Sequence, residues 1–191
     1  RRQRQMCIRD SSSSSHGNEW EDLRNYVLSN LLWDPSRSGD QLIKEFLRLH
    51  YGPAAAPIER WIYRLHARVA ASGKHCRCMG GTYADYGLDA TDIDAGVAAV
   101  EEAMRLAGND PTLRRRVGKM AVAAYRAALE PIWYLKEGDP VDPALVKRLR
   151  PRSDRFFALC REHGVTRTNE LSPHKSELLE LRLTNLPTTG G

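Results

Sequence analysis

The sequence predicts an all-α fold, an irregular bundle of six or seven helices with short connections. Apolar residues recur at helical spacing along most of the chain, and glycine, proline and helix-capping residues interrupt that pattern at short intervals. Runs of alternating or β-branched residues, which are typical of strands, are not present. With 191 residues, of which 41% are hydrophobic and 28% charged, the chain has the size and composition of one globular domain with a core of its own.

Three helices are expected before residue 74, and short signals separate them. Pro35 restricts the backbone of the residue before it and therefore ends the first helix. Ser38 and Gln41 have the spacing of a capping box, which starts the second helix. Gly52 and Pro53 suit the end of that helix and the first turn of the next. The expected helices cover residues 18–33, 38–52 and 53–72.

The pattern lapses from Lys74 to Asp89, where an irregular loop with a short strand around residues 76–79 is expected. A fourth helix then opens at Thr91 or Asp92, and a fifth begins at Asp110-Pro111. The remaining expectations are a kink or helix end near Pro131, a last substantial helix interrupted at Pro151, a short helix at 172–183 and a tail from 186.

The first residues, RRQRQMCIRDS, resemble translated sequencing-adapter DNA of the kind found at the ends of environmental gene assemblies. We therefore predict that residues 1–15, which include the serine run 11–15, are disordered and artefactual. The alternative is a natural basic tail that is solvated and attracts anions. Without the four arginines and the one aspartate of this segment, the formal net charge falls from +5 to +2. That value gives little support to nucleic-acid binding, and no nucleic-acid partner is expected.

Two further classes of protein are disfavoured. No apolar run approaches the roughly 18 to 20 residues that cross a bilayer, so no membrane partner is expected. The cysteines Cys7, Cys76, Cys78 and Cys160 are too few and too irregularly spaced for a disulfide framework. His75 could join Cys76 and Cys78 around a metal, but a fourth ligand at a standard spacing is missing. No metal site and no cofactor are predicted.

Two segments, YVLSNLLWDP at 26–35 and YGPAAAPI at 51–58, resemble the C-terminal part of the bacterial domain-of-unknown-function family numbered 4838. That family is distantly related to α-glucuronidases and β-hexosaminidases and has a (β/α)8 barrel before a helical region. The likeness runs from about His16 to about Asn169 and is weaker after Gly73. It implies that 16–34 are the last barrel loop and helix, 35–170 the helical C-terminal region, and 171–191 a short helix and flexible tail.

The resemblance implies that the strands that carry the catalytic carboxylates are not in this chain, and no catalytic residue is predicted. Barrel active sites gather at the loops that follow the strands, so the resemblance implies substrate-binding roles for His16, Asn18 and Glu19. Glu19 and Asp22 could also meet the carboxyl separation of a glycosidase, as could Asp92, which has no special neighbour in the sequence. The favoured interpretation is that Glu19, Glu21 and Asp22 complement the positive end of a helix.

Other residues with chemical potential have simpler interpretations. Arg114, Arg115 and Arg116 could bind a uronate carboxylate or a phosphate, but three consecutive helix positions fan out over about 200° and cannot all face one ligand. A solvated helix face is favoured. The tryptophans suit stacking on sugar rings, but core packing is favoured for them, because three of the four fall on apolar stripes or at a helix stop. Cys160 is predicted to be a small buried hydrophobe.

The resemblance favours a fragment of a carbohydrate-active protein, whose helical region supports a glycoside-hydrolase-like barrel missing here and contacts carbohydrate through that barrel. The parent would be a glycoside hydrolase, with the fragment inactive alone and a homodimer contact compatible with its position. The compartment is left open, with a secreted or periplasmic parent as one expectation. The alternative is a self-standing helical module that binds a partner protein through an exposed apolar face.

Overall fold

The computed structural model describes residues 20–74, 81–133 and 142–165 and confirms the all-α prediction. Six helices of at least 13 residues and one of four residues make up the described part, where no residue lies in a strand. The helices are α2 (Glu21–Trp33), α3 (Gly39–Tyr51), α4 (Ala55–Ser72), α5 (Ala90–Leu106), α6 (Pro111–Ala128), α7 (Glu130–Trp133) and α8 (Pro143–His163). Two 3₁₀ turns, η1 (Gly52–Ala54) and η2 (Tyr83–Tyr86), lie between them.

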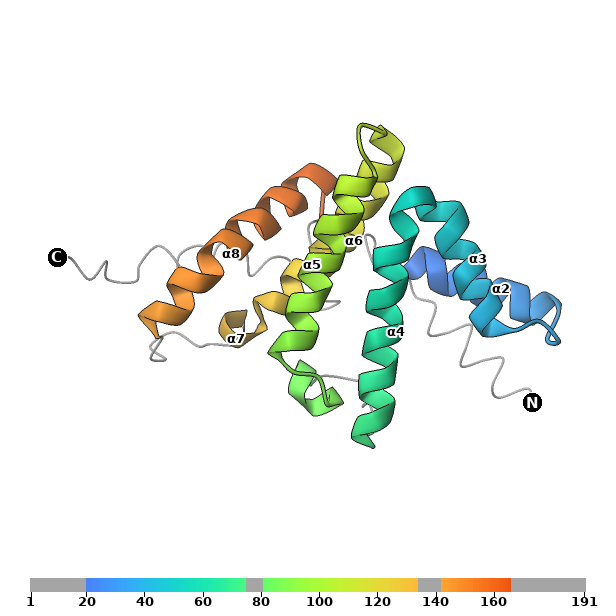
Figure 1. The fold of residues 1–191 in the computed structure, drawn as a ribbon, viewed down its shortest axis with the longest axis horizontal. Helices are drawn as coiled ribbons and strands as arrows, with labels where there is room; N and C mark the ends of the chain where they lie inside the picture. Colours follow the sequence, from blue (N-terminus) through green and yellow to red (C-terminus); the bar gives the residue numbers. More distant parts are fainter. Residues whose placement is uncertain (1–19, 75–80, 134–141, 166–191) are drawn as a thin grey trace.

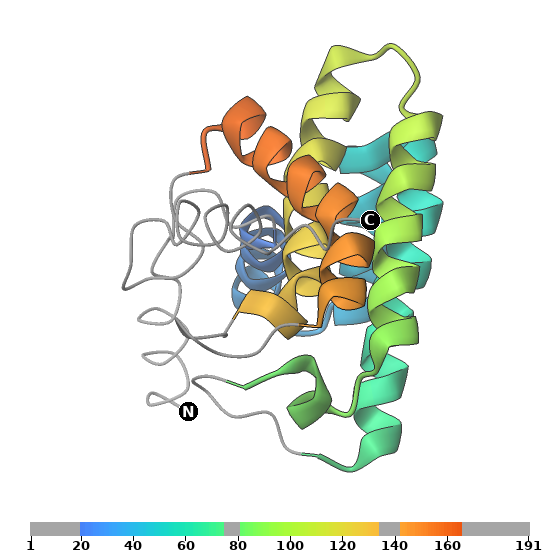
Figure 2. The same cartoon turned by 90° about the vertical axis from the view of Figure 1, so that its left-hand side faces the viewer.

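The core is built by consecutive helices that pack on one another. α5 packs against both α4 and α6, and α6 packs in turn against α8 (Figure 1). Figure 2 shows α4 and α5 side by side along one edge of the bundle, with α8 crossing in front of α6. α2 packs mainly on α3, away from this stack. The largest fully buried apolar side chains are Phe156, Leu42, Leu47, Ile58, Met120, Leu129, Leu149 and Leu159.

Most predicted helix ends are confirmed. α2 ends at Trp33, before Pro35, and the backbone N–H of Gln41 donates to Ser38 Oγ at 3.4 Å at the start of α3. Gly73 has φ +63° at the end of α4, the left-handed conformation that glycine adopts without strain. The expected strand at 76–79 and the expected helix at 172–183 lie outside the described residues.

The start of α5 differs from the prediction. The N-cap is Asp89, because its carboxylate accepts hydrogen bonds from the backbone N–H groups of Thr91 (2.8 Å) and Asp92 (3.1 Å). Asp92 completes the capping box by accepting from the Asp89 N–H at 3.2 Å. Thr91 and Asp92 therefore belong to the first turn of the helix, two and three positions after the cap.

Two prolines act differently from one another. α6 ends at Ala128, three residues before Pro131, because proline has no N–H to donate and its ring crowds the preceding turn. Pro151 was expected to interrupt the last helix, and that expectation is wrong: α8 runs unbroken from Pro143 to His163. Pro151 is exposed, whereas Leu149 and Phe156 are buried, so the carbonyl that loses its partner can be hydrated while the opposite face packs.

Two helical glycines allow close approach of neighbouring side chains. A Cβ on Gly96 of α5 would lie 2.6 Å from Nε1 of Trp61 on α4. A Cβ on Gly118 of α6 would lie 2.2 Å from Nε2 of His163 at the end of α8. Both distances are far below van der Waals contact, so these glycines make room for the helix packing on either side of the core.

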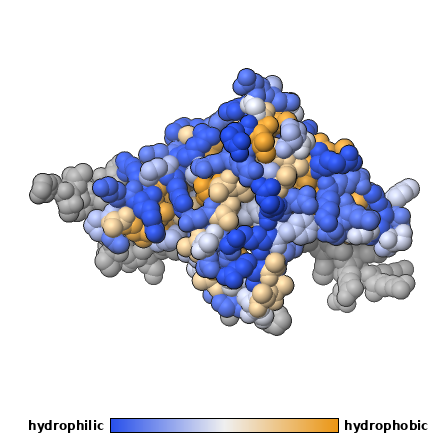
Figure 3. All heavy atoms as spheres, viewed as in Figure 1, coloured by the Kyte–Doolittle hydropathy of each residue, from blue (hydrophilic) through white to orange (hydrophobic). Residues whose placement is uncertain are grey.

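On the face of the molecule drawn in Figure 3, hydrophilic residues predominate, with smaller hydrophobic patches between them. Four large apolar side chains of the described part are exposed: Leu32, Trp33, Leu49 and Leu106. Trp33 is 92% exposed, which contradicts the preference for core packing at that position. None of the described helices is long and apolar enough to span a membrane.

Candidate functional site

The residues predicted to bind substrate, His16, Asn18 and Glu19, lie outside the described residues. The next residue in the chain, Trp20, is described, and it lines two neighbouring hollows at the base of α2. Its ring lies 5.6 Å from the ring of Trp61, between centroids. The chain that follows the predicted substrate-binding segment therefore starts at a concave part of the surface.

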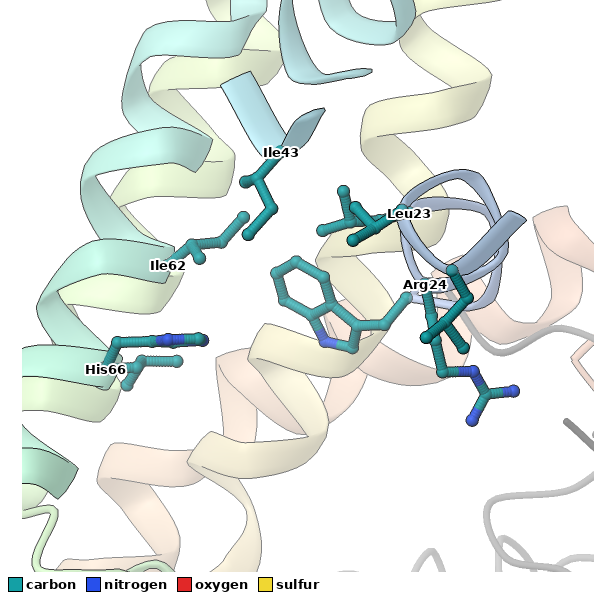
Figure 4. A pocket seen from close by; sticks show the side chains of 9 residues that line it. Leu23, Arg24, Ile43, Ile62 and His66 are labelled. Carbon is teal, nitrogen blue, oxygen red and sulfur yellow. The ribbon is translucent and has the colours of Figure 1, made fainter. Parts of the chain in front are cut away.

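The larger hollow, which we term the apolar groove, has a volume of about 480 Å³ and lies between α2, α3 and α4. Figure 4 shows Leu23, Ile43 and Ile62 directed toward one another across it, while the guanidinium group of Arg24 points away. Its lining is almost entirely apolar and consists of Trp20, Leu23, Arg24, Val27, Leu28, Ile43, Ile62, Leu65 and His66. Such a surface favours contact with another apolar surface over contact with water.

The second hollow, the aromatic pocket, shares Trp20 and Leu65 with the apolar groove and has a volume of about 260 Å³. Its remaining lining residues are Trp61, Gly81, Tyr83, Tyr86, Leu88, Ile93, Ala123, Ala124, Ala127 and Glu130. Two indoles and two phenol rings therefore surround a single carboxyl group. Aromatic faces with a few polar groups are the composition of pockets that bind ring-shaped polar ligands.

Glu130 connects the aromatic pocket to the loop that closes it. Its Oε1 accepts a hydrogen bond of 2.8 Å from the backbone N–H of Tyr83, 47 positions away in the chain. Burial raises the pKa of Glu130 above its ordinary value, although the Tyr83 hydrogen bond and the charge of Arg126 oppose that shift. A half-buried carboxyl with a raised pKa beside aromatic rings is a candidate for proton donation to a bound ligand.

Local bonds hold the loop 81–89 in place over the aromatic pocket. Thr82 and Asp85 form a capping box around η2, in which Asp85 Oδ2 accepts from the Thr82 N–H at 2.7 Å. Lys74 Nζ donates to the Ala84 carbonyl at 2.6 Å. The segment predicted only as an irregular loop thus has a defined structure and forms one wall of the pocket. The Thr82–Asp85 spacing, which is that of a capping box, was the signal for it in the sequence.

A third hollow, the basic pocket, lies between the start of α2, the end of α3 and the first turns of α6, and has a volume of about 280 Å³. It is lined by Asp22, His50, Tyr51, Thr112, Arg115, Arg116 and Lys119. Arg115 and Arg116 thus share one pocket, whereas Arg114 donates instead to the Gly108 carbonyl at 3.1 Å. The expectation that three consecutive arginines cannot face one ligand agrees with this geometry, but the solvated-face interpretation overlooked the pair.

Asp92 is fully buried and has a structural role. Its two carboxylate oxygens accept hydrogen bonds from Arg64 Nε (2.8 Å) and Arg68 Nε (2.9 Å), which lie on α4. Burial would raise the pKa of Asp92, but the bonds from Arg68, Asp89 and Arg64 outweigh it and hold the pKa below its usual value. The prediction that Asp92 has no special neighbour is wrong, since these arginines approach it from another helix. The arrangement joins α4 to the N-terminus of α5.

The described residues offer no group of three or more histidine, cysteine or acidic side chains that could hold a metal ion. His75, Cys76 and Cys78 lie outside those residues. Cys160 is buried as predicted, and burial raises the pKa of its thiol to about 11, so the thiolate is scarce at neutral pH. Glu21 and Asp22 occupy the first turn of α2, as the helix-end interpretation predicted.

The comparison with known families adds one finding. A family model described as Domain of unknown function (DUF4838) matches residues 2–64, which include both segments that carry the resemblance. This match supports the assignment over α2, α3 and the first half of α4, and it includes the residues interpreted as adapter-derived. No curated protein and no solved structure matches the chain.

Proposed function

We propose that this chain is a helical region of a carbohydrate-active protein, which packs beside a glycoside-hydrolase-like barrel through α2 and lines one side of the substrate cleft with the aromatic pocket. The observation that carries the proposal is that the apolar residues of α2 are not buried. Seven of its 13 residues are apolar, yet none is buried. A helix of this composition normally covers its apolar face with a neighbour, and the apolar groove is the surface that such a neighbour would occupy.

Arg24, at the rim of the apolar groove, supports the same idea. Its Nε atom is shielded from water and has no hydrogen-bond partner among the described residues. Leaving such a donor unpaired costs roughly 1–3 kcal/mol, and more when the group is charged. A rotation of the side chain that brings Nε against a carboxylate or carbonyl of a neighbouring domain would remove that cost.

The aromatic pocket supports the carbohydrate part of the proposal. Sugar rings present C–H faces to aromatic side chains and hydroxyl groups to polar ones, and the pocket offers Trp20, Trp61 and Glu130 for these contacts. The predicted binding residues His16, Asn18 and Glu19 come directly before Trp20, so under this proposal they extend the same surface. Glycoside hydrolysis needs two carboxyl groups, and Glu130 by itself does not supply the pair.

A direct test uses the indole N–H signals of the four tryptophans in a ¹H–¹⁵N spectrum of the full chain. We expect those of Trp20 and Trp61 to shift on addition of xylo- or cello-oligosaccharides. The signals of Trp33, which is exposed at the far end of α2, and Trp133, which packs on Phe156 in the core, are the internal controls and should stay in place. Assignments come from Trp20→Phe and Trp61→Phe. Equal shifts of all four signals, or none, would count against carbohydrate binding here.

The barrel part of the proposal is tested separately. We expect the coding sequence upstream to specify alternating strands and helices with acidic residues at strand ends, and we expect the 191-residue chain to be inactive on aryl glycosides. Turnover of any glycoside by this chain alone, or an upstream sequence without such alternation, would overturn it.

The exposed face of α2 also supports the alternative, a self-standing helical module that binds a partner protein. Thermal melting followed by light scattering distinguishes the two. A self-standing module is expected to melt cooperatively and remain dispersed, whereas a region that has lost its barrel neighbour is expected to self-associate through the apolar groove. Self-association that persists in Leu28→Gln would contradict a role for this groove.

A further inference from the structure

We infer that the basic pocket is a binding site for the oxyanion group of a small molecule, a phosphate or a carboxylate. The pocket is separate from the aromatic pocket and shares no lining residue with it. Three of its seven lining side chains are cations, Arg115, Arg116 and Lys119, and one, Asp22, is an anion.

The spacing of the α6 residues explains why they meet. Thr112, Arg115, Arg116 and Lys119 stand at positions i, i+3, i+4 and i+7, which form one stripe of an α-helix. The stripe Val117, Ala121, Ala124 and Ala128 of the same helix is apolar and buried. The stripe that starts at Thr112 is polar and faces a concavity that the end of α3 closes on the other side.

The three cations have different roles. Arg116 Nη1 donates to the His50 carbonyl at 2.7 Å, which fixes its guanidinium group at the C-terminus of α3. Arg115 and Lys119 form no ion pair and no hydrogen bond with any residue that the structure describes. Two unpaired cations beside a fixed guanidinium group give an anion several charge-assisted donors in one place.

The imidazole of His50 forms the opposite wall. Its ring stacks on Phe46 with 4.7 Å between centroids, which orients it. Burial and the charge of Arg116 lower the pKa of His50, so the ring is neutral at neutral pH and contributes no charge of its own. The NMR signals of the ring can therefore report a bound anion without a change in the protonation of His50 itself.

The test is an NMR titration of the full chain with sodium phosphate and, separately, sodium acetate, at constant ionic strength maintained with sodium chloride. The ring signals of His50, assigned with His50→Gln, are the readout. We expect a saturable shift with at least one of the two anions, and the identity of that anion assigns the ligand class. The absence of a saturable shift with both would overturn the inference.

Two matched double variants distinguish specific binding in the basic pocket from non-specific attraction by surface charge. The double variant Arg115→Gln, Lys119→Gln should weaken binding at least about tenfold, the loss of one or two charge-assisted hydrogen bonds. The matched control, Lys147→Gln with Arg148→Gln, removes the same charge from the exposed face of α8 and should change affinity by less than about twofold. Equal losses in both double variants would show non-specific attraction and overturn the inference.

A third variant works in the opposite direction and does not depend on loss of function. Asp22→Asn removes the one anionic side chain of the basic pocket. It should tighten anion binding about two- to threefold, as expected when one exposed like charge beside the anion is removed. Unchanged or weaker binding in Asp22→Asn would contradict an anion held at this place.

Discussion

α6 and α2 differ in how much of their apolar surface is covered. α6 buries eight residues, because α5 packs on one side of it and α8 on the other. α2 buries none, although seven of its 13 residues are apolar. Tyr26 holds it to α3, with a hydrogen bond from the hydroxyl to Glu45 and a ring contact of 5.5 Å to Phe46. Burial is thus decided by the neighbours that the fold supplies, and not by the composition of the helix.

The largest expected effect is at the centre of the packed region. Phe156→Ala on α8 should lower the free energy of unfolding by about 3–5 kcal/mol, the usual cost of removing a buried aromatic ring. Leu28→Ala on α2 should lower it by less than about 1 kcal/mol, because little surface is lost from the core. Urea denaturation of both variants gives the comparison. Equal losses would mean that α2 is as well packed as α8.

The buried carboxylate between α4 and α5 should have the next largest effect. Asp92→Asn should cost about 2 kcal/mol, since it weakens charge-assisted bonds to two arginines that remain partly hydrated. Asp94→Asn, whose pair with Arg152 is exposed, should stay within about 0.5 kcal/mol of the parent. The folded-state pKa of Asp92 is low, so its contribution is present at neutral pH and is lost as pH falls below 3.8. The difference between parent and Asp92→Asn should therefore shrink in acid.

The contact between α6 and α8 can be probed with a methyl group. Gly118→Ala should cost about 1–2 kcal/mol despite the better helix propensity of alanine, because its Cβ collides with the His163 ring. Adding His163→Ala should recover part of that loss. A double-mutant cycle by thermal melting measures the coupling, and additive effects would mean that the two residues do not touch.

The smallest expected effect is on the pH dependence of stability. Burial lowers the pKa of His163, so the unfolded chain binds more protons than the folded one just below pH 6.5. Stability should consequently fall as pH drops from 7.5 through 6.5, and it should fall less in His163→Gln. Urea midpoints at pH 7.5 and 5.5 measure the change. An equal difference between the two midpoints in the parent and in His163→Gln would exclude His163 as the source of the pH dependence.

The sequence predicted the fold class and most helix ends, because the signals involved are local. Pro35, Ser38 and Gly73 act on the residues beside them, and each stands at a helix end as expected. Of the capping box predicted at Ser38, the structure shows one bond, from the Gln41 N–H to Ser38 Oγ. The errors came from context. Pro151 was expected to break a helix, but it lies on an exposed face where the unpaired carbonyl can be hydrated. The arginine partners of Asp92 come from another helix, and no local pattern reveals them.

The candidate sites were less predictable for the same reason. The basic pocket had a usable signal, the polar stripe from Thr112 to Lys119, but the sequence does not show that the end of α3 closes over it. The Glu130 contact with the Tyr83 backbone spans 47 positions and leaves no periodic trace. The predicted binding residues 16, 18 and 19 lie outside the described residues and stay a prediction.

The position of Trp20 has a thermodynamic consequence. The indole of Trp20 lines both the aromatic pocket and the apolar groove. A ligand that fixes the ring from one side therefore alters the space and shape available on the other. The coupling free energy between a ligand in the pocket and a domain docked in the groove is the same whichever binds first. Each would therefore change the affinity of the other by an equal factor.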